Sequence, residues 1–254
     1  MAILLTNDDG IYSEGLLTLA KELKDIDDVV VVAPDGERSS VGHAITLRRP
    51  LRVQRVDRMI NVDSRVELYT CDGTPVDCVV LGVSEIMKGR EIKAVVSGIN
   101  RGLNLGIDII YSGTVAAAME GALLGLTAVA VSTIADDPSA FSTAALFIKD
   151  FLPKIVRRGL PEHTFLNINV PKSPRGVKFT KQGYKVYSGR VVNYKDPWGK
   201  VCFWIGGDVV EKFEDSSDIW AVSQGYISMT PLHVDLTNYK CLRLLEEWYD
   251  DRDG

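Results

Sequence analysis

The stretch Ala2-Ile-Leu-Leu-Thr6 runs directly into Asn7-Asp8-Asp9-Gly10. A short apolar run bounded by turn residues predicts a buried strand. Gly10 supplies the backbone freedom that a sharp turn after the strand requires. Ligands of open α/β sheets bind beyond the carboxyl ends of the strands. We therefore expect Asp8 and Asp9 to lie at the ligand-binding edge of a sheet.

The adjacent carboxylates of Asp8 and Asp9 allow two interpretations. Neighbouring carboxylates repel each other unless a cation or strong hydrogen-bond donors lie between them, and Mg²⁺ and Mn²⁺ prefer oxygen ligands. The alternative is that both residues only cap the next helix, which we expect to open at Ser13 or Glu14. For a carboxylate pair at a strand end we favour the divalent cation.

The composition limits the classes of protein to consider. The 254 residues are 46% hydrophobic, which is enough for a sizeable core. A net charge of -5 argues against a nucleic acid polymer or an anionic membrane as the main partner, and no apolar run is long enough to span a bilayer. The four scattered cysteines and the absence of a leader pattern lead us to expect reduced thiols in a cytoplasmic protein.

Apolar strand candidates alternate with helical patterns up to about residue 133. Strands are expected at 2–6, 29–34, 45–56, 66–71, 94–97, 127–132, 165–170 and 226–230, and helices at 14–23, 76–87, 115–124, 140–158 and 241–249. This alternation predicts an α/β fold with a Rossmann-like, doubly wound and mostly parallel sheet. The basic positions within 45–56 are expected to form a solvated face.

We expect a single α/β domain over 1–254, with a core of about 1–175 plus 221–231. Residues 176–210 hold seven aromatic side chains among Gly, Lys and Asp without a helical period, which predicts a projecting β-hairpin arm. Its aromatics are either a subunit contact or packed on their own domain. A C-terminal helical tail is expected at about 235–250.

Three loops are expected to meet at one edge of the sheet. They carry Asn7 to Asp9, the segment Arg38 to His43, and the segment Asn100 to Thr114. Ser112, Gly113 and Thr114 lie at a predicted helix start, where free N–H groups and the helix dipole favour an anion such as phosphate. Capping of that helix by Ser112 is the simpler interpretation and is compatible with the first.

The remaining candidates have chemically suitable side chains. Asn100 offers an amide oxygen to a metal or an N–H₂ group to phosphate, and Ser39 offers a hydroxyl to the metal or to its own turn. Arg38 is a candidate phosphate clamp, although as a single surface arginine it would be unremarkable. His43 is a candidate general acid for a leaving oxygen, although a lone histidine is more often structural.

These groups together predict hydrolysis of a phosphoryl group, in which the metal activates a water and neutralises phosphate charge. Competing motifs are missing. The first turn lacks the G-x-G-x-x-G of dinucleotide-binding folds, and the chain has no P-loop. Asn7 stands where a haloacid-dehalogenase phosphatase needs its nucleophilic aspartate, which argues against an aspartyl intermediate.

The same residues resemble the SurE (survival protein E) family of nucleotidases, and the resemblance covers nearly the whole chain. It rests on these segments in this order: Asn7-Asp-Asp-Gly10, Ala33-Pro-Asp-Gly-Glu-Arg-Ser39, Gly42-His43, Gly73-Thr-Pro-Val-Asp-Cys78, Ser97-Gly-Ile-Asn-Arg-Gly102, Tyr111-Ser-Gly-Thr-Val115 and Gly225-Tyr-Ile-Ser-Met-Thr-Pro231.

The resemblance implies a metal-dependent 5'-nucleotidase acting on nucleoside monophosphates. By position, it implies metal ligands at Asp8, Asp9, Ser39 and Asn100, and phosphate near Ser112, Gly113 and Thr114 with His43 close by. We assign catalytic roles to His43 and Asp9 and add Arg38 and Asn100 to the phosphate-binding residues. The resemblance also implies dimers built by exchange of C-terminal segments, and we expect a homodimer or homotetramer. The competing hypothesis is a non-catalytic nucleotide-binding regulatory module.

Overall fold

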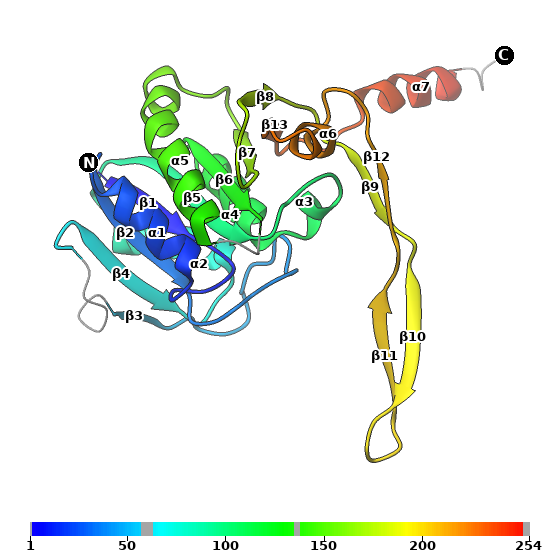
Figure 1. Cartoon of the computed structure of the whole chain (residues 1–254), viewed down its shortest axis with the longest axis horizontal. Helices are drawn as coiled ribbons and strands as arrows, with labels where there is room; N and C mark the ends of the chain where they lie inside the picture. The colour runs from blue at the N-terminus through cyan, green and yellow to red at the C-terminus, as the bar shows by residue number, and fades with distance from the viewer. Residues whose placement is uncertain (1, 57–62, 135–137, 251–254) are drawn as a thin grey trace.

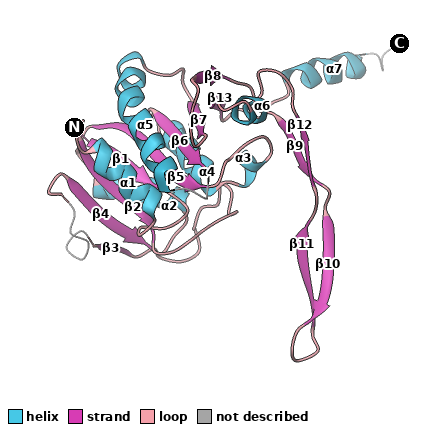
Figure 2. Ribbon diagram, viewed as in Figure 1, coloured by secondary structure: helices cyan, strands magenta, loops and turns pink. Residues whose placement is uncertain are grey.

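The computed structural model describes residues 2–56, 63–134 and 138–250. Its centre is a nine-stranded sheet in the order β3-β4-β2-β1-β5-β6-β7-β13-β8, with helices on both faces (Figures 1 and 2). The six strands from β4 to β7 in this order are parallel to one another, whereas β3 and β13 pair antiparallel to their neighbours β4 and β7. The predicted α/β fold with a mostly parallel sheet is confirmed.

The elements have the following bounds. The strands of this sheet are β1 (Ala2–Thr6), β2 (Asp28–Pro34), β3 (Val53–Arg55), β4 (Val66–Cys71), β5 (Ile92–Arg101), β6 (Ala128–Thr133), β7 (Thr164–Val170), β8 (Val177–Phe179) and β13 (Ile227–His233). The helices are α1 (Glu14–Leu23), α2 (Pro75–Leu81), η1 (Gly82–Ile86), α3 (Asp108–Tyr111), α4 (Gly113–Leu123), α5 (Pro138–Arg158), α6 (Asp218–Ser223) and α7 (Tyr239–Asp250).

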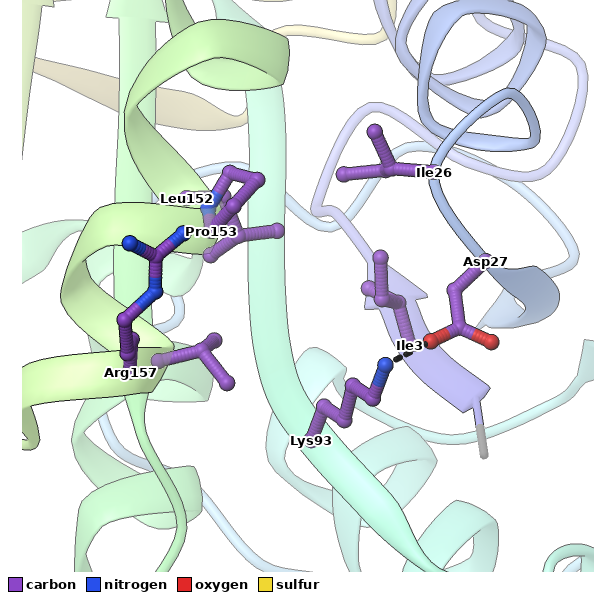
Figure 3. Close-up of a pocket in the computed structure, with 8 residues that line it drawn as sticks. Ile3, Ile26, Asp27, Lys93, Leu152, Pro153 and Arg157 are labelled. Carbon is purple, nitrogen blue, oxygen red and sulfur yellow. Dashed lines mark ion pairs between the residues drawn. The ribbon is translucent and has the colours of Figure 1, made fainter.

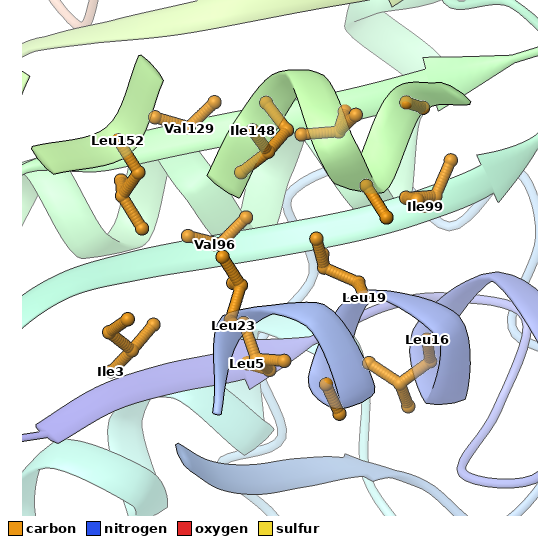
Figure 4. Close-up of a cluster of buried hydrophobic side chains, with 14 of the residues drawn as sticks. Ile3, Leu5, Leu16, Leu19, Leu23, Val96, Ile99, Val129, Ile148 and Leu152 are labelled. Carbon is orange, nitrogen blue, oxygen red and sulfur yellow. The ribbon is translucent and has the colours of Figure 1, made fainter. Parts of the chain in front are cut away.

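Two apolar layers bury the two faces of the sheet. Helices α1 and α5 cover one face, where Leu19 and Leu23 of α1 and Ile148 of α5 lie over Val96 and Val129 (Figure 4). Helices α2 and α4 cover the other face, where small side chains of α4 pack on Leu4 and Val95. Because both faces are buried, the central strands are continuous apolar runs without polar alternation.

Gly15 in the first turn of α1 allows this helix to lie directly on β5. A Cβ atom at Gly15 would stand 2.1 Å from the carbonyl oxygen of Ile99, so only glycine permits the approach. The close contact fixes the turn after β1 relative to the carboxyl end of β5. The two loops that carry Asp9 and Asn100 are thereby held side by side.

The direction of strand addition reverses between β1 and β5. From β1 the chain adds β2 and β4 on one side, whereas from β5 it adds β6 and β7 on the other. Such a switch point leaves a crevice beyond the carboxyl ends of the two diverging strands, which is where open α/β sheets bind ligands. Asp8 and Asp9 follow β1, and Asn100 is the penultimate residue of β5, so these candidates lie at the switch point.

The hairpin arm is built from two antiparallel pairs, β9 (Tyr184–Tyr187) with β12 (Val209–Lys212) and β10 (Arg190–Lys195) with β11 (Val201–Gly206). It projects away from the helices and the sheet (Figure 1). The arm was expected to begin at residue 176, but its first strand begins at Tyr184. The preceding strand β8 is not part of the arm, because it pairs with β13 at the edge of the main sheet. The aromatic side chains of the arm are exposed rather than packed on the main sheet.

One local prediction was wrong, and another was right only in part. Of residues 45–56, only Val53–Arg55 forms a strand, because the preceding segment bonds to the start of α2 instead: the Thr46 amide donates to Asp77 Oδ1 at 2.8 Å. The helix expected at 76–87 ends at Leu81 and continues as the wider helix η1. A Cβ at Gly82 would lie 2.8 Å from Leu4 Cδ1, so the chain here passes close to β1.

Candidate metal and phosphate site

Asn7 closes the turn after β1. Its buried side chain donates to the Gly10 carbonyl at 3.0 Å and accepts from the Gly10 amide at 3.2 Å, while Gly10 takes a φ of +96°. Its Nδ2 also donates to Ser13 Oγ at 2.6 Å, just before α1. Asparagine is suited to such turns because its side chain imitates a peptide group. Asn7 thus fixes the conformation of the turn, and Asp8 and Asp9 supply its negatively charged side chains.

Asp8 is the most buried carboxylate of the three candidate loops, with 4% of its surface exposed. Its Oδ1 accepts from the Thr114 hydroxyl, and its Oδ2 accepts from the Thr114 amide at 3.1 Å. These bonds place a carboxylate at the N-terminus of α4, where the helix dipole favours a negative charge. Burial nevertheless raises the pKa of Asp8 to about 6, and the neighbouring charge of Asp9 acts in the same direction.

Asp9 turns toward the end of β5. Its Oδ2 accepts from the Arg101 amide at 3.0 Å, directly after the candidate ligand Asn100. Burial also raises the pKa of Asp9, opposed by the Arg101 amide and reinforced by the charge of Glu37. Asp8, Asp9 and Glu37 therefore concentrate negative charge at the switch point.

The loop after β2 lies across this turn. The Arg38 amide donates to the Asp8 carbonyl at 2.7 Å. The guanidinium of Arg38 pairs with Asp35 at 2.8 Å, and the Ser39 hydroxyl donates to Glu37 Oε1 at 2.6 Å. Arg38 and Ser39 are thus brought beside the carboxylates. The Ser39 side chain bonds inside its own loop, whereas Arg38 Nε also donates to the Gly73 carbonyl at 3.4 Å.

Asn100 and the start of α4 complete the edge. Asn100 Nδ2 donates to the Gly102 carbonyl at 2.8 Å, which turns Oδ1 away from Gly102. Ser112 caps α4 by accepting from the Val115 amide at 3.1 Å, so the capping interpretation is confirmed. At Gly113 a Cβ would lie 2.9 Å from Asp8 Cβ, so this glycine allows the helix start to approach the carboxylate.

His43 is held against α4, further along the helix than Thr114. Its Nε2 lies 2.8 Å from Glu120 Oε2 and its Nδ1 lies 3.2 Å from Met119 Sδ. In the described parts of the chain, these are the polar partners of the His43 ring nitrogens, and neither is Asp8 or Asp9. The backbone of this loop is tied to the site instead, because the Gly42 amide donates to the Tyr111 carbonyl at 3.0 Å.

The donor set suits a hard divalent cation. Two carboxylates, one amide oxygen and one hydroxyl are the oxygen ligands that such a cation takes. Burying one carboxylate beside another, so that its pKa rises, is the arrangement that a cation relieves. No group of three or more His, Cys, Asp or Glu that could hold a metal occurs among the described residues, and the proposed set contains only two carboxylates.

Sequence reasoning missed three residues of this edge. Glu37 stood between Asp35 and Arg38 as an ordinary loop residue, although it faces Asp9 and Ser39. Glu120 looked like one polar position in a helix of small residues. Asp108 was read as part of a loop, although it accepts from Lys185 and Tyr187 of the hairpin arm, at 2.5 Å each. Long-range pairing of this kind leaves no signal in local spacing.

The hairpin arm and α6 fasten the loop between Asn100 and Ser112. The Gly106 amide donates to Asp218 Oδ2 at 3.0 Å, and the Gly106 carbonyl accepts from Gln182 Nε2 at 2.7 Å. Buried Asp218 also accepts from the Gly183 amide at 2.8 Å. The base of the arm therefore sets the position of the loop that leads into α4.

A separate pocket lies at the opposite edge of the sheet (Figure 3). Ile3 and Lys93, near the starts of β1 and β5, line it together with Leu152 and Pro153 of α5, and Lys93 pairs with Asp27 at 2.5 Å. Parallel strands place their amino ends far from their carboxyl ends, so this pocket is distinct from the candidate site.

The pKa of Asp8 predicts how the stability of the metal-free protein varies with pH. The unfolded value is 3.8 and the folded value is about 6, so protonated Asp8 stabilises the fold below about pH 4, and this contribution disappears as pH rises through 6. Between about pH 4 and pH values above 6, we expect the ionisation of Asp8 to lower the free energy of unfolding in EDTA by about 2–3 kcal/mol. Denaturant unfolding of Asp8→Asn, which lacks the ionisation, should show a flatter pH profile; identical profiles would contradict the assignment.

The Thr114 hydroxyl should support the ionised form of Asp8. Thr114→Val removes that donor at nearly constant volume, and we expect a loss of about 1–3 kcal/mol at pH 8 in EDTA. Thr114→Ser keeps the hydroxyl and is the matched control. Urea unfolding of both variants measures the difference, and equal stabilities would show that the bond contributes nothing.

The chain is similar to known proteins over nearly its whole length. Residues 3–189 match the family model described as Survival protein SurE. The chain is 48% identical to 5'-nucleotidase SurE of Geotalea uraniireducens over 98% of this chain and 99% of that protein, and 43% identical to that of Aquifex aeolicus over 96% of each.

A solved structure is similar over the same extent. It is described as the crystal structure of SurE protein from Aquifex aeolicus, with a TM-score of 0.82 and 41% identity over 98% of this chain and 100% of that one. The family match covers more than half of the chain, and the relatives cover nearly all of it. The protein therefore belongs to the SurE family.

Proposed function

We propose that this protein is a divalent-cation-dependent 5'-nucleotidase that releases phosphate from nucleoside 5'-monophosphates. Its full-length relatives in several bacteria carry the name 5'-nucleotidase SurE. The observation that carries the proposal is the Asp8–Asp9 pair at the β1–β5 switch point, one member of which is buried against the N-terminus of α4. A site that only recognised a nucleotide would gain nothing from two carboxylates beside a phosphate.

In this proposal Asp8, Asp9, Ser39 and Asn100 hold the cation, which would be Mg²⁺ or Mn²⁺. A bound cation of this kind lowers the pKa of a water and offsets phosphate charge. Thr114 fixes the orientation of Asp8 through two hydrogen bonds, and the Arg101 amide fixes Asp9. The protein thus orients its acidic ligands before substrate arrives.

The remaining candidates act on the substrate. The phosphate lies against Ser112 and Gly113 at the start of α4, where the helix dipole stabilises negative charge. Thr114 contributes indirectly, because its amide and hydroxyl are already bonded to Asp8. Asn100 and Arg38 contribute further donors to phosphate, for which Arg38 must leave its pair with Asp35. His43 donates a proton to the leaving nucleoside oxygen.

The cation requirement gives a direct test. We expect EDTA to abolish phosphate release from AMP and GMP and Mg²⁺ or Mn²⁺ to restore it. Asp9→Asn should lower kcat at least about 100-fold because it removes a charged ligand while leaving the buried core intact. Asp215→Asn, at an exposed carboxylate, should match wild type.

Colorimetric phosphate release with melting temperatures checks both points. Full activity in EDTA, or near-normal turnover by folded Asp9→Asn, would contradict the metal role. Nucleotide binding without phosphate release under every metal condition would instead support the non-catalytic regulatory module.

The exposed hairpin arm supports assembly into a homodimer or homotetramer. Val192 and Trp204 lie on one face of the β10–β11 pair, whereas Phe203 and Ile205 lie on the other, and all four are exposed. An isolated two-stranded ribbon is marginally stable in water, and exposed apolar patches of this kind mark association sites. We propose that a second copy covers the arm.

Removing these side chains should therefore weaken assembly. The double variant Phe203→Ser with Trp204→Ser is expected to shift the mass in light scattering toward that of a monomer. Lys195→Ser on the same hairpin should leave the mass unchanged. A wild-type protein that is monomeric at micromolar concentration would contradict the proposal.

The remaining conclusions on partners and location are also proposals. Cys71, Cys78, Cys202 and Cys241 are free thiols, which supports a cytoplasmic location. No helix among residues 2–56, 63–134 and 138–250 combines the length and hydrophobicity needed to cross a bilayer.

A further inference from the structure

The imidazole of His43 is fixed at both of its nitrogens by one helix. Nε2 lies 2.8 Å from Glu120 Oε2 and Nδ1 lies 3.2 Å from Met119 Sδ, and both partners belong to α4. The side chains of His43 and Glu120 are 31% and 14% exposed, respectively. A carboxylate this shielded from water holds a histidine more firmly than an exposed partner would.

Helix α4 also holds the acidic centre. Its first turn contains Thr114, which bonds Asp8, and about one and a half turns later Glu120 bonds His43. The helix is flanked by the Tyr111 carbonyl, which accepts from the Gly42 amide next to His43. A single rigid element therefore sets the distance between the candidate metal ligand and the candidate general acid.

We propose that Glu120 is a positioning residue for the hydrolytic reaction, acting through His43; this rests on the nucleotidase function proposed above. A carboxylate accepts hydrogen bonds only, so Glu120 requires a proton on Nε2. Nδ1 is then the nitrogen that serves the substrate. Its neighbour Met119 offers a thioether sulfur, a weak acceptor that a substrate oxygen can replace.

The step balances as follows. An oxygen of water forms a bond to phosphorus while the bond from phosphorus to the nucleoside O5' breaks, and its electron pair goes to O5'. Nδ1–H of the imidazolium gives its proton to O5', which leaves neutral His43 with Nε2–H still bonded to Glu120. The proton released by the attacking water goes to the phosphate product or to solvent, and water returns a proton to Nδ1.

The leaving group provides a readout that a purely structural role would not affect. A nucleoside alkoxide needs a proton as it departs, whereas the nitrophenolate of p-nitrophenyl phosphate leaves without one. We expect Glu120→Ala to lower kcat for AMP about 10- to 100-fold with KM within about threefold, and to change p-nitrophenyl phosphate hydrolysis by less than about threefold. Glu120→Gln should retain more AMP activity, because its amide oxygen still accepts from Nε2–H.

A double variant tests whether Glu120 acts through His43. If it does, His43→Ala with Glu120→Ala should be no slower on AMP than His43→Ala alone. Glu85→Gln, at an exposed carboxylate far from α4 in sequence, is the control that should match wild type. Melting temperatures of all variants identify any that fail to fold, and Glu120→Gln then replaces Glu120→Ala.

Two outcomes would overturn the inference while leaving the nucleotidase function intact. These are equal losses on AMP and p-nitrophenyl phosphate in folded Glu120 variants, and multiplicative losses in the double variant. Absence of cation-dependent hydrolysis of either substrate by the wild-type protein would instead overturn the proposed function itself.

Discussion

The structure depends on one costly contact, the burial of the Asp8 carboxylate at the start of α4. Two donors from Thr114 and the helix dipole favour the charge, yet the pKa of Asp8 still rises to about 6, so desolvation outweighs them. Asp9 and Glu37 add further negative charge nearby. A fold selected for stability alone would place an amide or an apolar side chain here. An unfavourable buried charge of this kind persists at functional sites because the surrounding packing maintains it. A cation bound to the carboxylates would compensate their charge.

Topology explains why this contact joins residues 106 positions apart in the sequence. Strands β1 and β5 are neighbours at the switch point, so the turn after β1 meets the connection from β5 to α4. Two glycines allow this approach. Because Gly15 has no side chain, α1 packs directly on β5, and because Gly113 has none, the start of α4 packs against Asp8. The chemistry of the edge is thus a consequence of backbone proximity that larger residues would prevent.

Local patterns predicted the elements better than the contacts between them. The runs in β1, β2 and β6 and the cap at Ser112 are signals within a few residues, and they predicted the parallel sheet and the loops at its edge. Residues 45–52 alternate like a strand but bond to Asp77 and Asp72 around α2, so the tertiary partner overrode the pattern. The pairing of His43 with Glu120 spans 77 positions, so local sequence patterns could not predict it either. Sequence spacing thus identified the acidic turn and the anion-favouring helix start, but not the side chains that orient them.

The hairpin arm is not independent of the site, although Figure 1 shows it projecting away from the sheet. Asp108 accepts from Lys185 and Tyr187 at the base of the arm, and it begins the short helix that ends next to Ser112. Gly106 is held from two sides, by Asp218 and by Gln182. The connection from Asn100 to Ser112 therefore has its ends in the sheet and in α4 and its middle on the arm. A change in the orientation of the arm base would therefore move this connection, because the two are joined by short hydrogen bonds. Asp108 accepts from Lys185 at 2.5 Å, and the Gly106 amide donates to Asp218 at 3.0 Å. The segment from Asn100 to Ser112 thus links two regions of the protein. One is the arm, which a second copy would cover, and the other is the edge of the sheet that would bind phosphate.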